Sequence, residues 1–188
     1  MTALTFEYPE LSGKRLELLR ELSPHIRRVL ALYDARDESP RQGAAAARAA
    51  ATALGLTLVT RDVRNADDLT RSLRFLDDAE ALLGIPGGVL SAHYDEMIRA
   101  AHAKRLPTIL HAGTAKTRDA LLTYGASDVE VARQAARALN KIIRGANAGE
   151  LPVERPSKLT LVVNLQTARA LKITVPRTLL LRATEIIE

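Results

Sequence analysis

Two glycine-containing stretches have residue types that bind phosphate in many proteins. Gly84, Gly87 and Gly88 lie in the sequence GIPGGVLS, and glycines after a strand can present backbone N–H groups to an anion. Their spacing does not fit G-x-G-x-x-G, so a flexible turn is the favoured interpretation. GTAKT at 113–117 is similar to the end of a P-loop, but Ala115 stands where that motif requires glycine. Neither stretch predicts a nucleotide site.

The four histidines give little support for metal binding or catalysis. His93 and His102 are nine residues apart on one expected helix, so they face opposite ways and cannot share a metal. His111, at an expected strand end, is a candidate ligand contact, with a plain loop residue as the alternative. Ser91 lies near His93 without the G-x-S-x-G elbow of a serine nucleophile. No carboxylate pair is placed for acid–base catalysis. The sequence therefore predicts no enzyme, metal or cofactor.

The composition narrows the class of protein. At 188 residues, with 47% hydrophobic and 26% charged residues, the chain is long enough for one α/β domain with a substantial core. The net charge of +5 comes from scattered basic residues, which favours a solvated surface over a nucleic-acid-binding one. Aromatic residues make up 3% and Trp is absent, so few side chains could stack on bases or sugars. Cysteine is absent too, which excludes disulfides and thiolate chemistry.

Membrane insertion and export signals are not expected from the sequence as written. No apolar run approaches the ~20 residues that a membrane span needs. The first residues, MTALTFEYPELSGK, have neither a basic start nor an apolar core, so we expect no signal peptide and a cytoplasmic location if the chain is expressed in this form.

Strands and helices are expected to alternate along most of the chain. The expected strands cover about 27–33, 56–63, 80–86, 106–113 and 120–127, and a late apolar run at 159–165. The expected helices cover 12–22, 40–54, a segment after Asn65, 91–104 and a long segment after Ser127, with closing helices from Gln166. This alternation predicts an α/β fold with a parallel sheet flanked by helices.

Several residues are expected to fix the helix ends. The expected N-caps are Ser39, Asn65 and Ser127, the last in a capping box with Glu130, and the expected C-terminal stops are Gly55 and Gly145. The long helix has an apolar side formed by Ala132, Ala135, Ala136, Leu139 and Ile143.

Ligands in sheets of this kind bind beyond the carboxyl ends of the strands. Those ends are expected at Tyr33-Asp34, Asp62, Pro86-Gly87-Gly88, His111-Ala112-Gly113 and Tyr124-Gly125. The sequence therefore predicts that a ligand site, if there is one, lies along this edge.

Three stretches of the chain resemble ABC-transporter substrate-binding proteins related to the tryptophan-binding type. They are PELSGKRLELLRELSPHIRRVLALYD, AAATALGLTLVTRDVRNADDL and the block from LTYGASDVE to the C-terminus. The last block is the most specific, with the loop KIIRGANAGELPVERPSK, the unit VNLQTARAL and the closing P-x-x-LL-x-x-A-x-E-I-I-E. The resemblance runs from about residue 3 to 188 and covers the second lobe and C-terminal portion of the family only.

The resemblance implies a type I periplasmic-binding-protein fold, in which two α/β lobes joined by a hinge close on a small ligand. Residues 1–126 would form one substrate-binding lobe. Residues 127–188 would hold a hinge-crossing helix, a Pro-bracketed loop, a strand and closing helices. The implied function is the solute-binding component of an ABC transporter, or a truncated lobe of one, that binds a small molecule such as an amino acid without catalysis. The implied location is periplasmic.

Carried over position by position, the resemblance places six residues at the cleft: Tyr33, Asp34, Pro86, Gly87, His111 and Tyr124. Two departures bear on the ligand. Tyr33-Asp34-Ala35-Arg36 stands where relatives usually have an Asn-Pro turn, and Pro86-Gly87 stands where they often have Pro-Asp, so a carboxylate that could meet a ligand amine is gone. The alternative is that these are loop residues of a lobe that no longer binds.

The implied partners are a small-molecule ligand, an ABC permease and either a separate first lobe or a second copy of the chain. An absent lobe is expected to show as an exposed strand edge at 159–165 or as a helix that reaches away from the core. The alternative function is a stand-alone α/β regulatory or protein-interaction module with no transport ligand. A nucleic-acid binder ranks third, and would be retained on polyanions in a steeply salt-dependent way.

Overall fold

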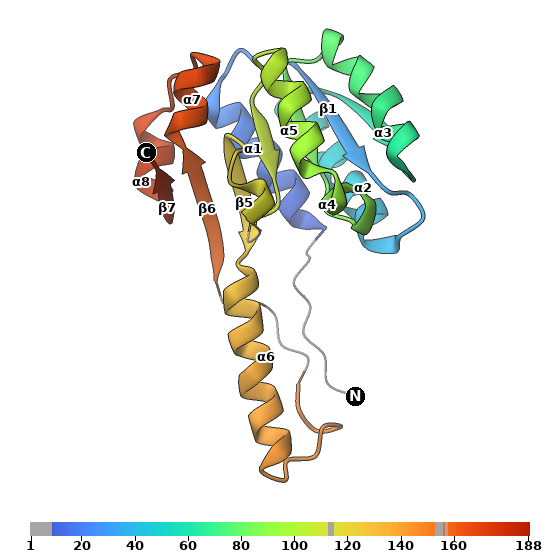
Figure 1. The fold of residues 1–188 in the computed structure, drawn as a ribbon, viewed down its shortest axis with the longest axis vertical. Helices are drawn as coiled ribbons and strands as arrows, with labels where there is room; N and C mark the ends of the chain where they lie inside the picture. The colour runs from blue at the N-terminus through green and yellow to red at the C-terminus, as the bar shows by residue number, and fades with distance from the viewer. Residues whose placement is uncertain (1–8, 113–114, 153–155, 157) are drawn as a thin grey trace.

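The apolar runs of the sequence form a seven-stranded sheet in the order β2-β1-β3-β4-β5-β6-β7 (Figure 1). The structure is a computed structural model and describes residues 9–112, 115–152, 156 and 158–188. The strands are β1 Arg28–Tyr33, β2 Thr57–Asp62, β3 Ala81–Gly84, β4 Thr108–Leu110, β5 Leu122–Ala126, β6 Leu159–Asn164 and β7 Glu185–Ile187. The first five are parallel, β6 is antiparallel to β5, and β7 is parallel to β6. The expected mostly parallel α/β sheet is confirmed.

Helices cover both faces of this sheet. They are α1 Glu10–Leu22, α2 Glu38–Leu54, α3 Ala66–Leu73, α4 Gly88–Ala92, α5 Tyr94–Ala103, α6 Asp128–Ile143, α7 Leu165–Leu171 and α8 Arg177–Arg182, with short 3-10 helices η1 Arg74–Asp78 and η2 Ala115–Thr117. Successive residues of a strand point to opposite faces. Accordingly Val29 and Ala31 join a core with α1 and α2. Leu30 and Leu32 join a second core with α3, α4 and α5.

The expected helix ends are partly confirmed. The Asn65 side chain accepts a hydrogen bond from the Asp68 N–H at 2.9 Å, and Gly55 ends α2 in the left-handed region at φ 65°. The Ser39 cap is wrong, because α2 begins at Glu38 and takes Asp37 as its N-cap. Ser127 does precede α6 but makes no side-chain cap. The capping box fails as well.

Glu130, the other half of that expected capping box, has a different partner. Its carboxylate accepts a hydrogen bond from Arg133, one helical turn onward, at 2.5 Å. A guanidinium gives the carboxylate a charge-assisted hydrogen bond. The side chain is therefore engaged along the helix and does not reach back to the Ser127 N–H.

The expected helix over 91–104 is divided in two. His93 ends α4 and precedes α5, with φ −118° and ψ 16°. His93 and His102 therefore do not share one continuous helix, as the sequence had predicted. The His93 N–H is bonded to the Leu90 carbonyl in a tighter turn.

The late run of the sequence completes the sheet. β6 pairs with β5, with Leu122 opposite Val163 and Ala126 opposite Leu159, and pairs on its other side with β7. The exposed strand edge expected at 159–165 is therefore wrong, because the last residues of the chain cover it. The strand itself and the helix that follows it are confirmed.

Asn164 fastens this C-terminal part to the middle of the chain. Its side chain accepts from the Thr167 N–H at 2.8 Å, which caps α7, and donates to the Arg118 carbonyl at 2.7 Å. The residue is 3% exposed. One side chain thus serves a helix start and a loop that is 46 residues away in the sequence.

Replacing Asn164 with alanine is expected to lower the free energy of unfolding by about 3 kcal/mol. The change removes a helix cap worth about 1 kcal/mol and leaves buried backbone groups without partners, at about 2 kcal/mol. Asn65→Ala is the matched control, because it removes a cap at an exposed helix start and is expected to cost about 1 kcal/mol. Urea denaturation followed by circular dichroism measures both. Equal losses would contradict the anchoring role of Asn164.

Helix α6 leaves the carboxyl end of β5 and extends away from the sheet (Figure 1). The apolar side predicted for it exists, but among the described residues it faces no core. Its five residues are all exposed. The exposed fraction is 56% for Leu139 and 75% for Ile143, and the neighbouring Val129 is also 56% exposed. The helix that reaches away was expected in the late stretch 151–171, whereas α7 there packs its buried residues against the sheet and α6 is the helix that extends away. No helix within the described part of the chain is long and apolar enough to span a membrane.

Candidate ligand-binding site

The carboxyl ends of β1 to β5 lie along one edge of the sheet, since these five strands are parallel. Some of the residues predicted from the sequence belong to two hydrogen-bonded groups along this edge. One group surrounds Asp34 after β1. The other surrounds His111 after β4 and the Tyr124-Gly125 segment of β5.

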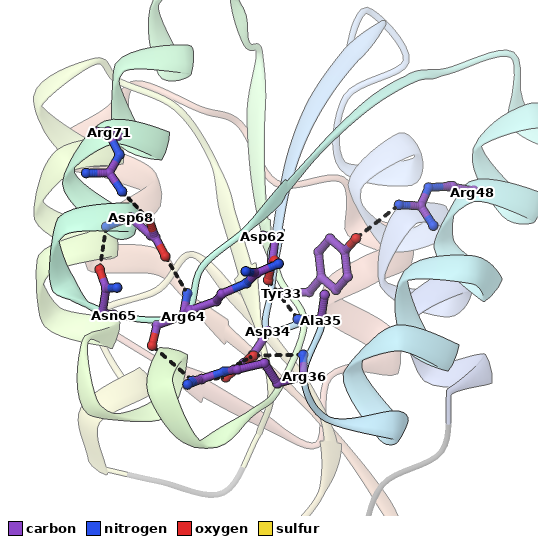
Figure 2. Close-up of polar contacts among 10 residues, drawn as sticks. All are labelled: Tyr33, Asp34, Ala35, Arg36, Arg48, Asp62, Arg64, Asn65, Asp68 and Arg71. Carbon is purple, nitrogen blue, oxygen red and sulfur yellow. Dashed lines mark hydrogen bonds and ion pairs between the residues drawn. The ribbon is translucent and has the colours of Figure 1, made fainter.

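Asp34 is buried and already paired. It is 2% exposed, and it accepts from the Arg36 N–H at 3.0 Å and from Arg36 Nε and Nη2 at 3.0 and 2.7 Å (Figure 2). The hydrogen bonds from Arg36 lower the pKa of Asp34, although burial acts in the opposite direction. The carboxylate is thus ionised, and its charge is taken up by one guanidinium.

The same arrangement recurs after β2. Asp62 accepts from the Ala35 N–H at 2.8 Å and from Arg64 Nε at 2.6 Å. Arg36 Nη2 donates to the Arg64 carbonyl at 2.9 Å, which joins the two loops (Figure 2). The Arg36 and Arg64 side chains are 54% and 59% exposed. The carboxylates therefore point inward and the two guanidiniums form the rim.

Arg36 and Arg64 were missed as site residues, although the sequence carries a signal for both. Asp34-Ala35-Arg36 and Asp62-Val63-Arg64 repeat the pattern D-x-R, and Tyr33 lies opposite Asp62 in the sheet. Two D-x-R units at the ends of adjacent parallel strands predict two arginines at one edge.

Tyr33 points away from this rim. Its hydroxyl accepts from Arg48 Nη2 at 3.4 Å, and the Arg48 guanidinium carbon lies 5.7 Å from the ring centre (Figure 2). Arg48 also donates to Thr60 Oγ1 at 2.9 Å. The structure therefore places Tyr33 beside α2 and β2, apart from the Asp34 carboxylate.

Pro86 and Gly87 lie close to Asp34. Pro86 is buried. A Cβ added to Gly87 would lie 3.1 Å from the Pro40 ring and 3.9 Å from the Asp34 Cβ. The small size of Gly87 thus lets the loop after β3 approach the start of α2. The structure brings Asp34, Pro86 and Gly87 together, as expected for a shared edge.

His111 and Tyr124 meet at a buried arginine from α1. His111 Nδ1 lies 3.3 Å from Arg15 Nη2, and Arg15 Nε donates to the Tyr124 carbonyl at 2.9 Å. A Cβ on Gly125 would lie 2.6 Å from His111 Nδ1. Burial, together with the charge of Arg15, lowers the pKa of His111 to about 4. The imidazole is therefore neutral near pH 7.

Arg15 was not predicted as part of this group. It is 2% exposed and occupies a position on the buried face of α1 that it shares with Leu11, Leu18 and Leu22. A cation at an apolar helical position is rarely buried unless it is paired. The position of Arg15 among the leucines of α1 could therefore have indicated from the sequence that it has a buried partner.

The side chains at this edge can position a ligand, but they offer no set of metal ligands. Among the described residues there is no group of three or more His, Asp or Glu side chains that could hold a metal ion. The arrangement can present a guanidinium, backbone groups of glycine-containing loops and a neutral imidazole to a small molecule.

The parallel sheet with helices on both faces, and with its loops gathered at the carboxyl edge, is the architecture of one lobe of a periplasmic binding protein. The chain belongs to the ABC transporter substrate-binding protein family, whose model matches residues 9–187. The recognition made from the sequence is confirmed. No curated protein matches the sequence.

Solved structures with a similar fold include three relevant proteins. A conserved domain protein of Vibrio cholerae has a TM-score of 0.88 at 22% identity, over 98% of this chain and 62% of that one. An ABC domain of Streptococcus pneumoniae in complex with L-tryptophan has a TM-score of 0.84 at 17% identity, over 99% and 64%. An open, ligand-free substrate-binding protein with adhesive properties from Clostridium difficile has a TM-score of 0.70 at 15% identity, over 99% and 62%.

These three similarities concern the fold of the chain and its length relative to the similar proteins. The chain spans slightly less than two thirds of each of the three structures. A transcriptional regulator of the LacI family from Bifidobacterium animalis also shares the fold, with a TM-score of 0.59 at 15% identity over 82% of this chain and 60% of that one. At these identities the similarity establishes the architecture.

Proposed function

We propose that this chain is the second lobe of the solute-binding component of an ABC transporter, and that it contacts a small molecule such as an amino acid without catalysing a reaction. Family membership supports the transport role. The L-tryptophan complex of the similar Streptococcus pneumoniae domain supports the ligand class. Uptake across a bilayer requires a permease as partner, and the lobe would act outside the membrane, in the periplasm.

The observation that carries the proposal is the exposed guanidinium of Arg36. Asp34 fixes its Nε and Nη2 side, while Nη1 makes no hydrogen bond with another described residue. An arginine held in this way presents two N–H donors in a fixed direction, which suits a carboxylate. We propose that the carboxylate of the ligand binds there, with Asp34, Pro86 and Gly87 at the base of the site. His111 and Tyr124 remain proposed contacts at its margins, whereas Tyr33, which points toward Arg48, lies outside this carboxylate site.

We further propose that α6 is the helix that crosses to a first lobe and that its exposed side packs against that lobe. The supporting observations are the exposed Leu139 and Ile143 and the greater length of the three similar structures. One lobe covers a ligand from one side, whereas small-molecule sites bury most of the ligand surface. A ligand that touches both lobes favours the closed state by its differential contacts.

The test is the melting temperature of the chain in the presence of each of the 20 amino acids, alone and co-expressed with a first lobe of the family. We expect a shift only with both lobes present, because stabilisation follows the ratio of free ligand to Kd. An equal shift for the chain alone would overturn the need for a first lobe. No shift in either sample would overturn the amino-acid class.

The role of Arg36 is tested by Arg36→Gln, which is expected to weaken binding by about 10- to 100-fold, since a hydrogen bond to a charged group is worth about 1.5–3 kcal/mol. Because Arg36→Gln alone leaves the buried Asp34 carboxylate without its guanidinium, the double change Asp34→Asn with Arg36→Gln makes residue 34 neutral as well. It therefore separates a loss of binding from a loss of folding. Arg182→Gln is the matched control, because Arg182 on α8 is also an exposed arginine and forms an ion pair with Glu21 at 2.6 Å. Equal affinities for Arg36→Gln and Arg182→Gln would contradict the assignment.

A further inference from the structure

A hollow on the sheet is lined by residues other than those of the Asp34 and His111 groups. Its volume is about 290 Å³, and its walls come from η2, β5, β6, β7 and the start of α6. This volume is at the lower end of the range of small-molecule sites. None of the residues predicted from the sequence lines it. It is therefore a separate candidate site.

The floor of the hollow is one row across three neighbouring strands. Thr123 of β5 lies opposite Val162 of β6, and Val162 lies opposite Glu185 of β7. Thr160 lies two residues from Val162 on the same strand, so both side chains point to this face. Ser127, which makes no cap for α6, stands at one end.

Thr123 has an unused hydroxyl in this floor. The residue is 4% exposed, lines the hollow and makes no side-chain hydrogen bond with another described residue. Its Oγ1 is not among the buried side-chain atoms that lack a partner, so it is accessible from the hollow. A group that enters the hollow can exchange hydrogen bonds with it.

Among the described residues that line the hollow, the charges balance. Arg118 Nη2 and Glu185 Oε1 form an ion pair at 3.2 Å, and both residues line the hollow. The other polar side chains of this described lining are hydroxyls, which both donate and accept hydrogen bonds. An anion or a cation would have to compete with one partner of this pair. A neutral ligand would leave the pair intact and still find donors and acceptors.

We propose that this hollow is a binding site for a small neutral polyhydroxylated molecule, of the size of a polyol or a monosaccharide. Its hydroxyls exchange hydrogen bonds with Thr123, Thr160 and Ser127. Its C–H faces rest on Val129, Val162 and Ile187, which together with Ala115 supply the apolar part of the described lining. The site is independent of the proposed amino-acid cleft, because it uses other residues and another class of ligand.

The test titrates glycerol, myo-inositol, D-ribose and D-glucose, up to 50 mM, into the ¹⁵N-labelled chain and follows amide chemical shifts. We expect saturable shifts around β5, β6 and β7 with at least one of them. Thr123→Val removes the hydroxyl that faces the hollow and is expected to weaken that binding at least tenfold. Val162→Phe fills the hollow and is expected to abolish it. Thr178→Val, on the exposed side of α8, is the control and is expected to leave the affinity unchanged.

Three results would overturn the proposal. The first is that no polyol produces saturable shifts up to 50 mM. The second is that Thr123→Val binds as tightly as the parent chain. The third is that sodium acetate or ethylammonium chloride binds at this site while the polyols do not, which would show that the site selects a charge. Glycine and L-tryptophan are titrated into a parallel sample that also contains a first lobe, where they probe the cleft, so a failure of the polyol site is distinguishable from a failure of the proposed transport ligand.

Discussion

Replacing Gly125 with alanine is expected to lower the free energy of unfolding by about 3 kcal/mol. The added Cβ would lie 2.6 Å from His111 Nδ1, 2.9 Å from His111 Cε1 and 3.3 Å from Arg15 Nη2. Both neighbours are buried, so neither can move into solvent without cost. Overpacking of this kind costs about 1–3 kcal/mol, and displacing His111 also breaks its contact with Arg15, at about 1–2 kcal/mol.

Gly88→Ala is the matched control for this prediction. No atom lies within 4 Å of a Cβ added there, and its φ is not positive. Alanine at such a position restricts the unfolded chain, so the variant is expected to be as stable as the parent or up to about 1 kcal/mol more stable. Urea denaturation followed by circular dichroism suits a chain without Trp. Equal effects of the two substitutions would show that Gly125 is not needed for the packing of His111.

The sequence was sufficient to predict those elements whose structure depends on residues that are close to one another along the chain. The apolar runs of β1, β5 and β6 and the caps at Gly55 and Asn65 follow from local patterns, and all are found. Ser127 is an exception, because its spacing from Glu130 predicted a capping box that does not form. In the folded helix the Glu130 carboxylate accepts a hydrogen bond from Arg133 instead. Local rules identify the available partners, and the competition among them is decided by the folded helix.

Pairings between distant segments were the part that sequence reasoning missed. β7 has three residues, Glu185–Ile187, which is too short to show a period of two. It forms because β6 offers an unpaired edge. The sequence placed closing helices at this end of the chain, and these are present as α7 and α8. The strand after them depends on a tertiary contact.

The candidate site shows the same division. Parallel topology placed Asp34, Pro86, Gly87 and His111 after the strands at one edge, as predicted, whereas Tyr124 lies within β5 and not at its end. The sequence did not predict what holds each of them. Asp34 is matched by Arg36 two residues onward, whereas His111 is matched by Arg15, 96 residues earlier. The first partner was recognisable from the D-x-R spacing, and the second required the packing of α1 against the sheet.

His111 makes the unfolding free energy depend on pH. Arginine donates hydrogen bonds and accepts none, so Nδ1 of His111 must accept from Arg15 Nη2 at 3.3 Å. A proton on that nitrogen would place two positive groups in contact inside the protein. Burial and this neighbour lower the pKa of His111 from 6.5 to about 4. The folded protein therefore excludes a proton that the unfolded chain accepts.

The stability of the chain is accordingly expected to fall as the pH decreases from 6.5 to 4. Above pH 6.5 both states hold a neutral imidazole, and the penalty is absent. Between pH 6.5 and 4 the unfolded state binds more protons, so acid favours unfolding. The difference of about 2.5 pKa units, at about 1.4 kcal/mol each, amounts to about 3 kcal/mol at pH 4. Most of this loss precedes the protonation of carboxylates with ordinary pKa values near 4.

His111→Gln tests this dependence, because glutamine can accept the hydrogen bond from Arg15 and does not titrate. The variant is expected to lose stability at pH 7, where its packing is poorer, and to show a slope smaller by about 1 kcal/mol per pH unit between pH 6 and 4.5. His102→Gln is the matched control. Its pKa is also lowered, chiefly by burial, but it lies on α5, outside the Arg15 group. If His102→Gln removed the slope and His111→Gln left it unchanged, the acid sensitivity would belong to α5. If neither changed it, the carboxylates would account for the acid sensitivity, and the contact between Arg15 and His111 would have no part in it.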